Sequence, residues 1–509
     1  MEKWNKVKLA TAATAALLAC GTLTTASADD AQPKRSLKGN MMEVYNVLPK
    51  SVDSLDKAFT EGVFYGRLRM NSFMWDWKND DIAGTGNKDN KAFGIGGSMI
   101  YKTAPFKGFS ATAGMYYSGS PFSGLRASVA DLGYIKAGKD TISRYDAKYN
   151  GDYYMAVLAQ SYLQYDFSKT TVKFGRQIFE SFLTKSNDTK MIPNTFDGLV
   201  IETKEIPQTR IRGAYFMEQK LRDHSKFHDV ITFKDSSGDS WGNNDDSAIH
   251  KGLSYANFQA AGKSVDHKLI VADLQNKSIN NLQIDVTYGS VPDVVSSITG
   301  ELNYKIALGS GYTLTPGVRY MKQMDNGGGK IGGACLKGGL AGLYGAQDGY
   351  KKAESLDSSL YMARLALTNG PLKAQIAYSA VEDAADIVAP WRGFPTGGYT
   401  RAMAQYNWYA NTKTMAAEVK YNFGKAKMIP GFTAMVRYAV QNFDDKKQVA
   451  GVQADSNIIH VDLLEQITPA LSAKLRVGLV SADNRVAGSK AGKDVDSYNE
   501  YRFELNYLF

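Results

Sequence analysis

The feature that most constrains this chain is an alternation of apolar and polar side chains that recurs in segments of about ten residues. In residues 62–77, Phe64 and Leu68 alternate with Arg67 and Arg69. Successive side chains of a strand point to opposite faces, so one face is apolar and the other is charged. We predict eighteen strands at residues 62–77, 91–102, 108–118, 152–166, 170–180, 196–204, 209–218, 267–276, 281–289, 297–307, 312–321, 358–369, 372–380, 414–424, 432–443, 457–467, 471–481 and 497–509.

The joins between these strands alternate in length. Every second join is a short turn such as Gly370-Pro371, whereas most of the others are long, as at residues 219–266 and 322–357. Residues 254–261 also alternate, but a strand there makes nineteen and moves the long 322–357 join to the short-turn side, so we expect a loop. Short turns on one side and long loops on the other are typical of an outer-membrane β-barrel with both termini in the periplasm.

A soluble β-sandwich also shows a two-residue alternation, but three features favour a membrane barrel. In this chain the polar face of the strands carries full charges in mid-strand, and the joins between strands alternate in length. Aromatic residues also lie near strand ends on the apolar face, namely Tyr378, Tyr421, Phe423, Tyr438 and Tyr507. In hydrocarbon only a closed sheet satisfies every backbone hydrogen bond. About eighteen strands enclose a lumen too wide for side chains to fill, which predicts an aqueous channel.

The N-terminus predicts export. Residues 1–28 combine a basic start, a short apolar run over 9–22 and Ala26-Ser27-Ala28, the pattern of a secretory signal peptide. No run of 18 apolar residues follows, which excludes transmembrane helices. Export also argues against a nucleic-acid partner for the net charge of +9.

The mature chain divides into two parts in this interpretation. Residues 29–61 form a periplasmic N-terminal segment with loosely helical spacing interrupted at Pro49, and residues 62–509 form the barrel. The sequence around Cys20 also resembles a lipoprotein cleavage site, so lipidation there stays open as an alternative. Only Cys335 remains after signal removal, so no internal disulfide is expected.

The charged face of the strands predicts a basic lumen. Inward acids are fewer than inward bases, and arginine offers a planar fork that matches carboxylates. The alternative is that these bases pair with acids across the strands and only solvate the wall. The candidate solute-guiding residues are Arg67, Arg69, Lys173, Arg210, Arg212, Arg319, Arg364, Arg437, Lys474 and Arg476.

Three stretches resemble a known family. Residues 175–177 read G-R-Q, and residues 188–198 (D-T-K-M-I-P-N-T-F-D-G) follow the D-x-R-x-x-P-x-x-F-[ED]-G pattern of OprD-type porins, except that Lys190 stands where arginine is usual. Residues 429–438 resemble the late I-P-G hairpin of the same family. Residues 58–62, just before the first predicted strand, are similar to the corresponding stretch in a related branch of the family seen in epsilon- and deltaproteobacteria.

The resemblance implies an eighteen-stranded, monomeric or loosely trimeric channel with a basic ladder for carboxylate-bearing solutes. Loops 181–195 or 381–413 would form the constriction. Partners would be outer-membrane lipid, lipopolysaccharide, the barrel assembly machinery and small solutes, and the terminal Phe509 resembles the signal that this machinery reads. We expect no cofactor, no metal site and no catalytic residue. The alternative function is a surface protein, an adhesin or phage receptor, acting through its long loops.

Overall fold

The structure is a computed structural model, and it describes residues 35–37, 42–78, 88–138, 141–185, 191–233, 250–336, 349–391, 393–403, 406–447, 454–483 and 497–509. The expected signal peptide, its cleavage site and Cys20 lie outside these residues. Within them, no helix is long and apolar enough to cross a bilayer.

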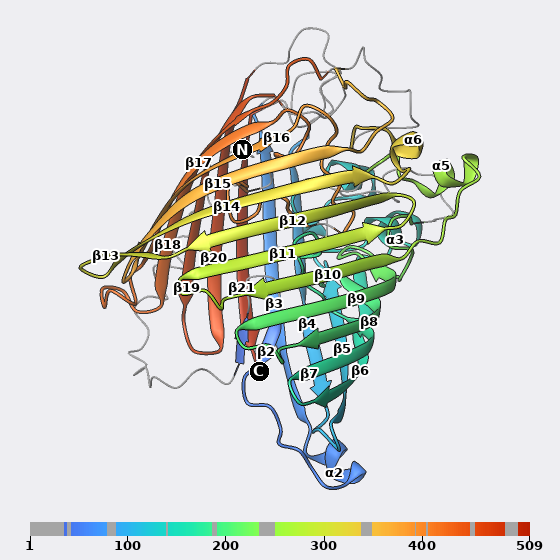
Figure 1. Cartoon of the computed structure of the whole chain (residues 1–509), viewed down its shortest axis with the longest axis vertical. Coiled ribbons are helices and arrows are strands. Elements are labelled where there is room, and N and C mark those ends of the chain that lie inside the picture. The colour runs from blue at the N-terminus through green and yellow to red at the C-terminus, as the bar shows by residue number, and fades with distance from the viewer. Residues whose placement is uncertain are drawn as a thin grey trace.

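One closed antiparallel barrel dominates the fold (Figure 1). Its strands are β3 (Val63–Trp77), β4 (Asn90–Lys102), β5 (Phe109–Gly119), β6 (Tyr154–Phe167), β7 (Thr170–Gln177), β8 (Thr195–Thr203), β9 (Thr209–Lys220), β10 (Leu269–Asn276), β11 (Leu282–Val291), β12 (Val295–Tyr304), β13 (Ile306–Gly309), β14 (Tyr312–Asp325), β15 (Ser358–Asn369), β16 (Leu372–Val381), β17 (Lys413–Asn422), β18 (Phe432–Asn442), β19 (Ser456–Gln466), β20 (Leu471–Ala482) and β21 (Tyr498–Leu508). Because β13 continues β12 and both pair with β14, the barrel has eighteen strands, which confirms the predicted architecture.

Short elements complete the chain. They are the two-stranded sheet β1 (Arg35–Leu37) and β2 (Glu43–Tyr45), the helices α2 (Leu55–Thr60), α3 (Arg144–Tyr149), α5 (Tyr255–Ala260) and α6 (Gly329–Gly332), and the 3-10 turns η1 (Ser123–Leu125) and η2 (Val129–Tyr134). The ambiguous segment 254–261 is therefore a helix rather than a strand. Its start is capped by the Ser254 side chain, which accepts a hydrogen bond from the Asn257 backbone N–H.

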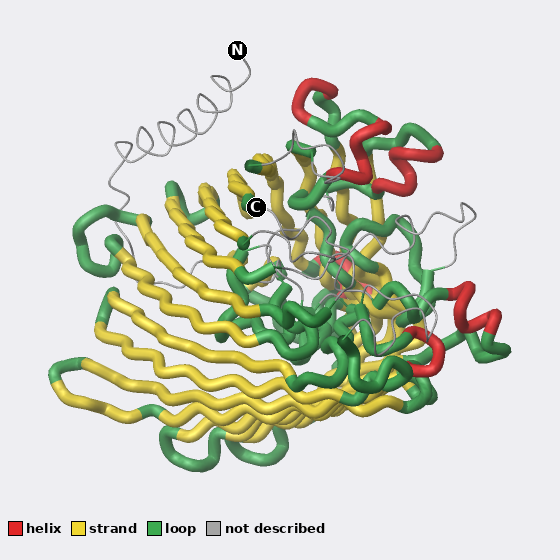
Figure 2. Tube along the Cα trace, turned by 90° about the horizontal axis from the view of Figure 1, so that it is seen from above, coloured by secondary structure: helices red, strands yellow, loops and turns green. Residues whose placement is uncertain are grey.

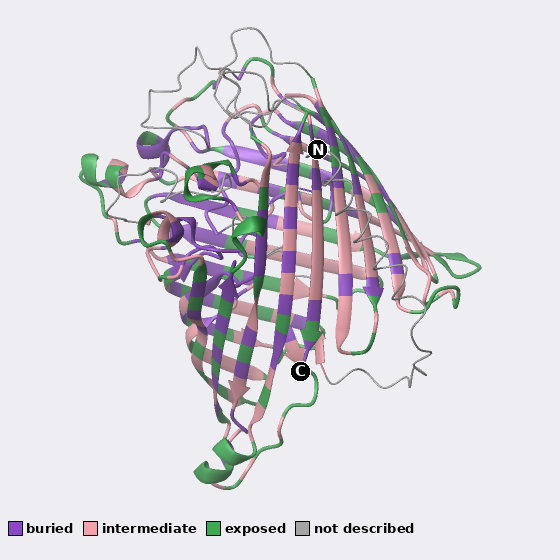
Figure 3. Cartoon of the chain, turned by 180° about the vertical axis from the view of Figure 1, so that it is seen from behind, coloured by how far each residue is buried: buried purple, intermediate pink, exposed green. Residues whose placement is uncertain are grey.

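The strands place their two faces as the alternation predicts. On β3, Phe64 is 57% and Leu68 59% exposed on the outside, whereas Arg67 and Arg69 are buried inside. Figure 3 shows the resulting alternation of buried and exposed positions along the strands. The outer face is therefore the apolar surface that a lipid environment requires.

The barrel closes where the last strand meets the first. The N–H groups of Phe509 and Gly66 each donate to the other's carbonyl at 3.1 Å, and the Phe509 ring lies 6.1 Å from the ring of Phe64. A Cβ on Gly66 would lie 2.1 Å from the Ser98 carbonyl oxygen, so only glycine allows this close approach.

The long connections fold back into the barrel. Viewed from above, loop segments lie inside the arc of strands (Figure 2). Their apolar residues bury themselves against the inner wall, and Trp391, Trp408 and Tyr399 are among the most buried side chains. The barrel is therefore narrowed by packed protein at its long-loop end.

Candidate functional site

The lumen contains a cavity of about 920 Å³ between the inner wall and two inward-folded loops. One loop follows β7 and contributes Ser181, Phe182 and Lys185. The other follows β16 and contributes Phe394 and Arg401. The sequence left open which loop forms the constriction. Within the described residues, both loops line the cavity.

The two loops are fastened to each other. The Asn194 side-chain amide donates to the Trp391 carbonyl oxygen at 2.9 Å, and the Trp391 indole N–H donates at 3.0 Å to the Val230 carbonyl oxygen of a third loop, which follows β9. The backbone at Gly393 approaches Leu183 so closely that a Cβ would lie 1.9 Å from the Leu183 carbonyl oxygen. These contacts fix the width of the passage through packing rather than through a hinged lid.

The charged side chains that line the cavity are unequal in number. Among the described residues there are ten bases and six acids. The bases are Lys173, Lys185, Arg210, Arg212, Arg319, Arg364, Arg401, Arg437, Arg476 and Arg502, and the acids are Glu180, Glu202, Asp273, Asp285, Glu301 and Asp462. Because bases exceed acids, the mean potential of the cavity is positive.

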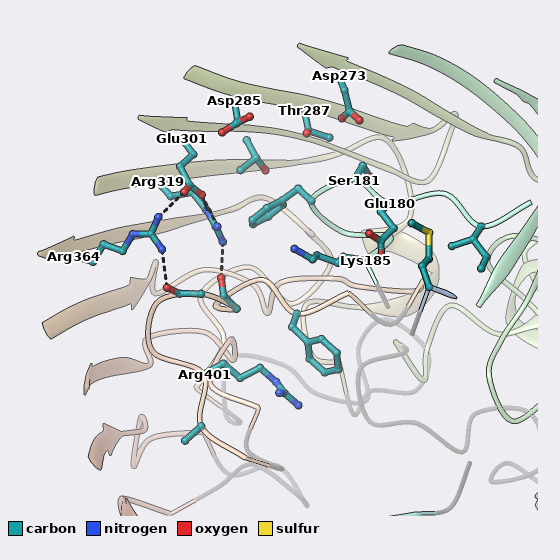
Figure 4. Close-up of a pocket in the computed structure, with 18 of the residues that line it drawn as sticks. Glu180, Ser181, Lys185, Asp273, Asp285, Thr287, Glu301, Arg319, Arg364 and Arg401 are labelled. Atoms are coloured by element: carbon teal, nitrogen blue, oxygen red, sulfur yellow. Dashed lines mark hydrogen bonds and ion pairs between the residues drawn. The ribbon is translucent and has the colours of Figure 1, made fainter. Parts of the chain in front are cut away.

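Three charged residues form a cluster beside the loop that follows β16 (Figure 4). Glu301 on β12 pairs with Arg319 on β14 and, at 3.2 Å, with Arg364 on β15. Both guanidinium groups also donate to the loop, Arg319 to the Gly397 carbonyl and Arg364 to the Gly398 carbonyl, each at 3.0 Å. These arginines therefore hold the constriction loop as well as lining the passage.

Several other candidate solute-guiding arginines pair with carboxylates on neighbouring strands. Arg212 pairs with Asp273, Arg437 with Glu418, and Arg476 with Asp462 at 2.8 Å. These three arginines therefore fit the alternative given by the sequence, in which bases pair with acids across the strands instead of guiding the solute. Their charge is largely compensated where it stands.

Four lining cations form no ion pair with any described residue: Lys173, Arg210, Lys185 and Arg401. Lys173 lies 5.2 Å from the centre of the Tyr162 ring, and the Arg401 guanidinium stacks 3.7 Å above the Phe394 ring. Aromatic faces stabilise a cation without neutralising it. These four positions therefore supply the net positive charge of the passage.

Arg67, Arg69 and Lys474 face inward as expected but do not line the main cavity. Arg67 has a 1% exposed side chain and pairs with Glu43 of β2 at 3.1 Å, and Arg69 pairs with Glu504. Lys474 lines a separate small cavity beside Arg476. We infer that these three residues stabilise the wall and the N-terminal segment rather than guide the solute.

The cover over Arg67 is β2, a part of the N-terminal segment that lies inside the barrel. Glu43 accepts a hydrogen bond from the Ser98 hydroxyl at 2.6 Å, Tyr45 stacks on Tyr65, and Met42 lines the main cavity. Among the described residues of 29–61, the expected helical spacing is realised in α2 alone. Sequence spacing could not show that the preceding residues enter the lumen, because their contacts are with strands far away in the chain.

Sequence reasoning also missed Lys185 and Arg401. Both lie on loops, where no two-residue period indicates which way a side chain points. The turn-rich segment around Gly397 was the available signal, since such segments bend the chain sharply enough to return it into a lumen.

The residues that resemble the porin family, 175–177 and 188–198, lie at the two ends of the loop after β7 that lines the cavity. The Gln177 side-chain amide donates to the Gly198 carbonyl at 3.1 Å, and Arg176 lies 3.4 Å from the Asp197 carboxylate. Gly198 packs so closely on β9 that a Cβ would lie 2.1 Å from the Tyr215 carbonyl oxygen. The motif thus fixes both ends of the loop that carries Lys185.

Comparisons with known proteins agree with this geometry. Residues 130–509 match the family described as outer membrane porin, OprD family. No single curated protein sequence is significantly similar to the chain.

Solved structures share the fold at low sequence identity. Acinetobacter baumannii OccAB3 is 15% identical with a TM-score of 0.64, over 88% of this chain and 99% of that one. Pseudomonas aeruginosa OccK9 (OpdG) is 16% identical with a TM-score of 0.62, over 89% and 99%. Pseudomonas aeruginosa OpdK, whose structure is with vanillate, is 15% identical with a TM-score of 0.59, over 88% and 98%.

Proposed function

The chain belongs to the OprD family of outer membrane porins, and on that premise we propose that its lumen conducts small solutes that carry a carboxylate. The protein is a channel of the bacterial outer membrane and not an enzyme. The charges of the passage support this assignment of the solute's chemistry.

The observation that supports the proposal is the set of four lining cations that form no salt bridge with a carboxylate among the described residues. Lys173, Lys185, Arg210 and Arg401 keep their charge available in a confined cavity. A confined positive potential concentrates anions, and guanidinium groups bind carboxylates through paired hydrogen bonds. OpdK, a relative in fold, is known with vanillate, an aromatic carboxylate.

The same cavity offers a second kind of contact. Phe182 and Phe394 line it beside Arg319 and Arg401, so a solute meets aromatic faces next to cations. A small carboxylate with an apolar body fits these two surfaces better than an inorganic anion does, because its body displaces water from the rings.

We further propose how the protein is placed and assembled. Residues 1–28 are removed after export, the long loops face outward, and the terminal Phe509 is read by the barrel assembly machinery. Lipid and lipopolysaccharide surround the wall, and the barrel works as a monomer or loose trimer. The inward packing of the loops favours a channel over an adhesin or phage receptor.

Uptake into protein-loaded liposomes tests the solute class. Swelling rates should be higher for benzoate than for its neutral isostere benzamide, since only the anion gains from the unpaired cations. The difference should shrink as salt rises, because the Debye length is about 8 Å at physiological ionic strength and shorter above it. Equal rates for the two compounds at low salt would refute the carboxylate preference while leaving the channel itself intact.

A further inference from the structure

A second cavity lies on the opposite face of the wall from the solute pathway. It has a volume of about 460 Å³ and lies over β11, β12, β14 and β15. Its outward side chains are almost all apolar: Ile284, Val286, Leu302, Val318, Tyr320 and Tyr361. We call it the outer groove. Leu302 and Val318 are 45% and 51% exposed, so this groove opens away from the lumen.

Gly300 creates the outer groove. It lies in mid-strand on β12, paired with Val286 on one side and Tyr320 on the other. No atom lies within 4 Å of the position that its Cβ would occupy, and its φ is not left-handed. Neither crowding nor backbone conformation therefore requires glycine here. The missing side chain leaves a hollow in an otherwise continuous apolar surface.

A cation lies at the long-loop end of the groove. Lys322 follows Tyr320 by two residues on β14, so both point outward, and its Nζ lies 3.3 Å from the Ser359 hydroxyl and 3.8 Å from Glu382. Its side chain is 37% exposed. Below it, the rings of Tyr320 and Tyr361 lie 5.2 Å apart. Tyrosines with lysine above and aliphatic residues below mark a membrane–water interface.

We propose that the outer groove binds an acyl chain of lipopolysaccharide while Lys322 binds a phosphate of the same molecule. This rests on the proposed orientation, in which the long loops face outward and the lysine lies in the leaflet that contains this glycolipid. At the opposite end Leu302 and Ile284 continue into Tyr304 and Leu282. A lysine near a membrane surface attracts anionic headgroups.

Glu382 sets the selectivity of this site. A ligand phosphate competes with the Glu382 carboxylate for Lys322, and their exposed contact at 3.8 Å is a weak one. A zwitterionic or uncharged headgroup offers no net charge to replace it. The site therefore distinguishes phosphorylated from dephosphorylated glycolipid.

Native mass spectrometry of the full, folded chain tests the proposal. Detergent-purified protein stripped of lipid is titrated with bisphosphorylated lipid A, with dephosphorylated lipid A and with phosphatidylglycerol. We expect one lipid A to bind in preference to the other two. Gly300→Leu fills the hollow and should weaken lipid A binding roughly tenfold, as the loss of one to two buried methylene contacts implies. Lys322→Gln should weaken it about fivefold and abolish the preference over the dephosphorylated probe.

Two matched variants separate the site from general effects. Gly213 is an outward glycine on β9 with equally open space before it, and Lys413 is an exposed lysine at the long-loop end of β17. Gly213→Leu and Lys413→Gln should leave binding unchanged. Heat-modifiable migration shows that each variant is folded, and bilayer conductance, which all four should preserve, reports the pore separately.

Two results would overturn the proposal. One is retention of phosphatidylglycerol as strongly as lipid A, which would assign the groove to ordinary phospholipid. The other is unchanged lipid A binding in folded Gly300→Leu, which would mean that the glycolipid binds elsewhere. Either result leaves the solute pathway untouched, because conductance is measured on the same preparations.

Discussion

Reversing the charge at Arg210 should weaken the anion preference of the pore. Arg210 lines the cavity from β9 and forms no ion pair within 4 Å of any described carboxylate, so Arg210→Glu changes the local charge by two units without breaking a salt bridge. An ion passing at about 6 Å in water-like dielectric interacts with one charge by about 0.7 kcal/mol, and screening roughly halves this. Two charge units therefore change each ion's energy by about 0.7 kcal/mol.

The effect on selectivity is larger because anions and cations shift in opposite directions. The ratio of anion to cation permeability should fall by about 1.4 kcal/mol, or roughly tenfold. Reversal potentials in a KCl gradient across a planar bilayer measure this ratio directly. Lys413→Glu, a charge reversal of the same size on the outside of β17, is the control and should change nothing.

Two properties of the native pore are expected in the same measurement. The native pore must prefer anions, and the preference must weaken as salt rises. A cation-selective native pore, or an unchanged ratio in Arg210→Glu at low salt, would show that the unpaired cations do not set the potential of the passage.

Three further predictions address assembly, the N-terminal segment and the loops. Deleting Phe509 removes its two hydrogen bonds to Gly66 and should lower the yield of heat-modifiable, membrane-inserted protein, and wild-type yield would contradict this. Glu43→Ala removes the carboxylate that pairs with the buried Arg67 guanidinium, at a cost of about 3–5 kcal/mol, so β2 should leave the lumen and single-channel conductance should rise; unchanged conductance would show that the segment does not obstruct the pore. Burial raises the pKa of Asp386 in the loop after β16 to about 6, above its unfolded value, so loop stability should increase as pH falls from about 6 to about 4; amide hydrogen-exchange protection factors that do not rise, or that rise equally in Asp386→Asn, would count against this.

The strand pattern, the strand count and the placement of charge on one face were determined by the sequence alone. The alternation has a period of two, and a one-residue slip would turn every side chain to the wrong face. The outward direction of Phe64 and the inward direction of Arg67 are therefore encoded in the local sequence. The closed barrel follows from the same pattern, because apolar outer faces require lipid and lipid tolerates no open edge. For these reasons the predicted strand limits agree with β3 to β21 to within about three residues at most ends.

Only the tertiary structure decided which inward charges meet the solute. The alternation along the strands predicts that Arg67 and Arg210 both point into the lumen. In the structure Glu43 and β2 cover Arg67, whereas Arg210 lines the cavity. Loop residues such as Lys185 and Arg401 enter the passage through contacts between segments some two hundred residues apart, as between Asn194 and Trp391. Local sequence fixes the direction of a strand side chain. It does not fix what covers that side chain or which distant carboxylate neutralises it, because both depend on how the long loops pack inside the barrel.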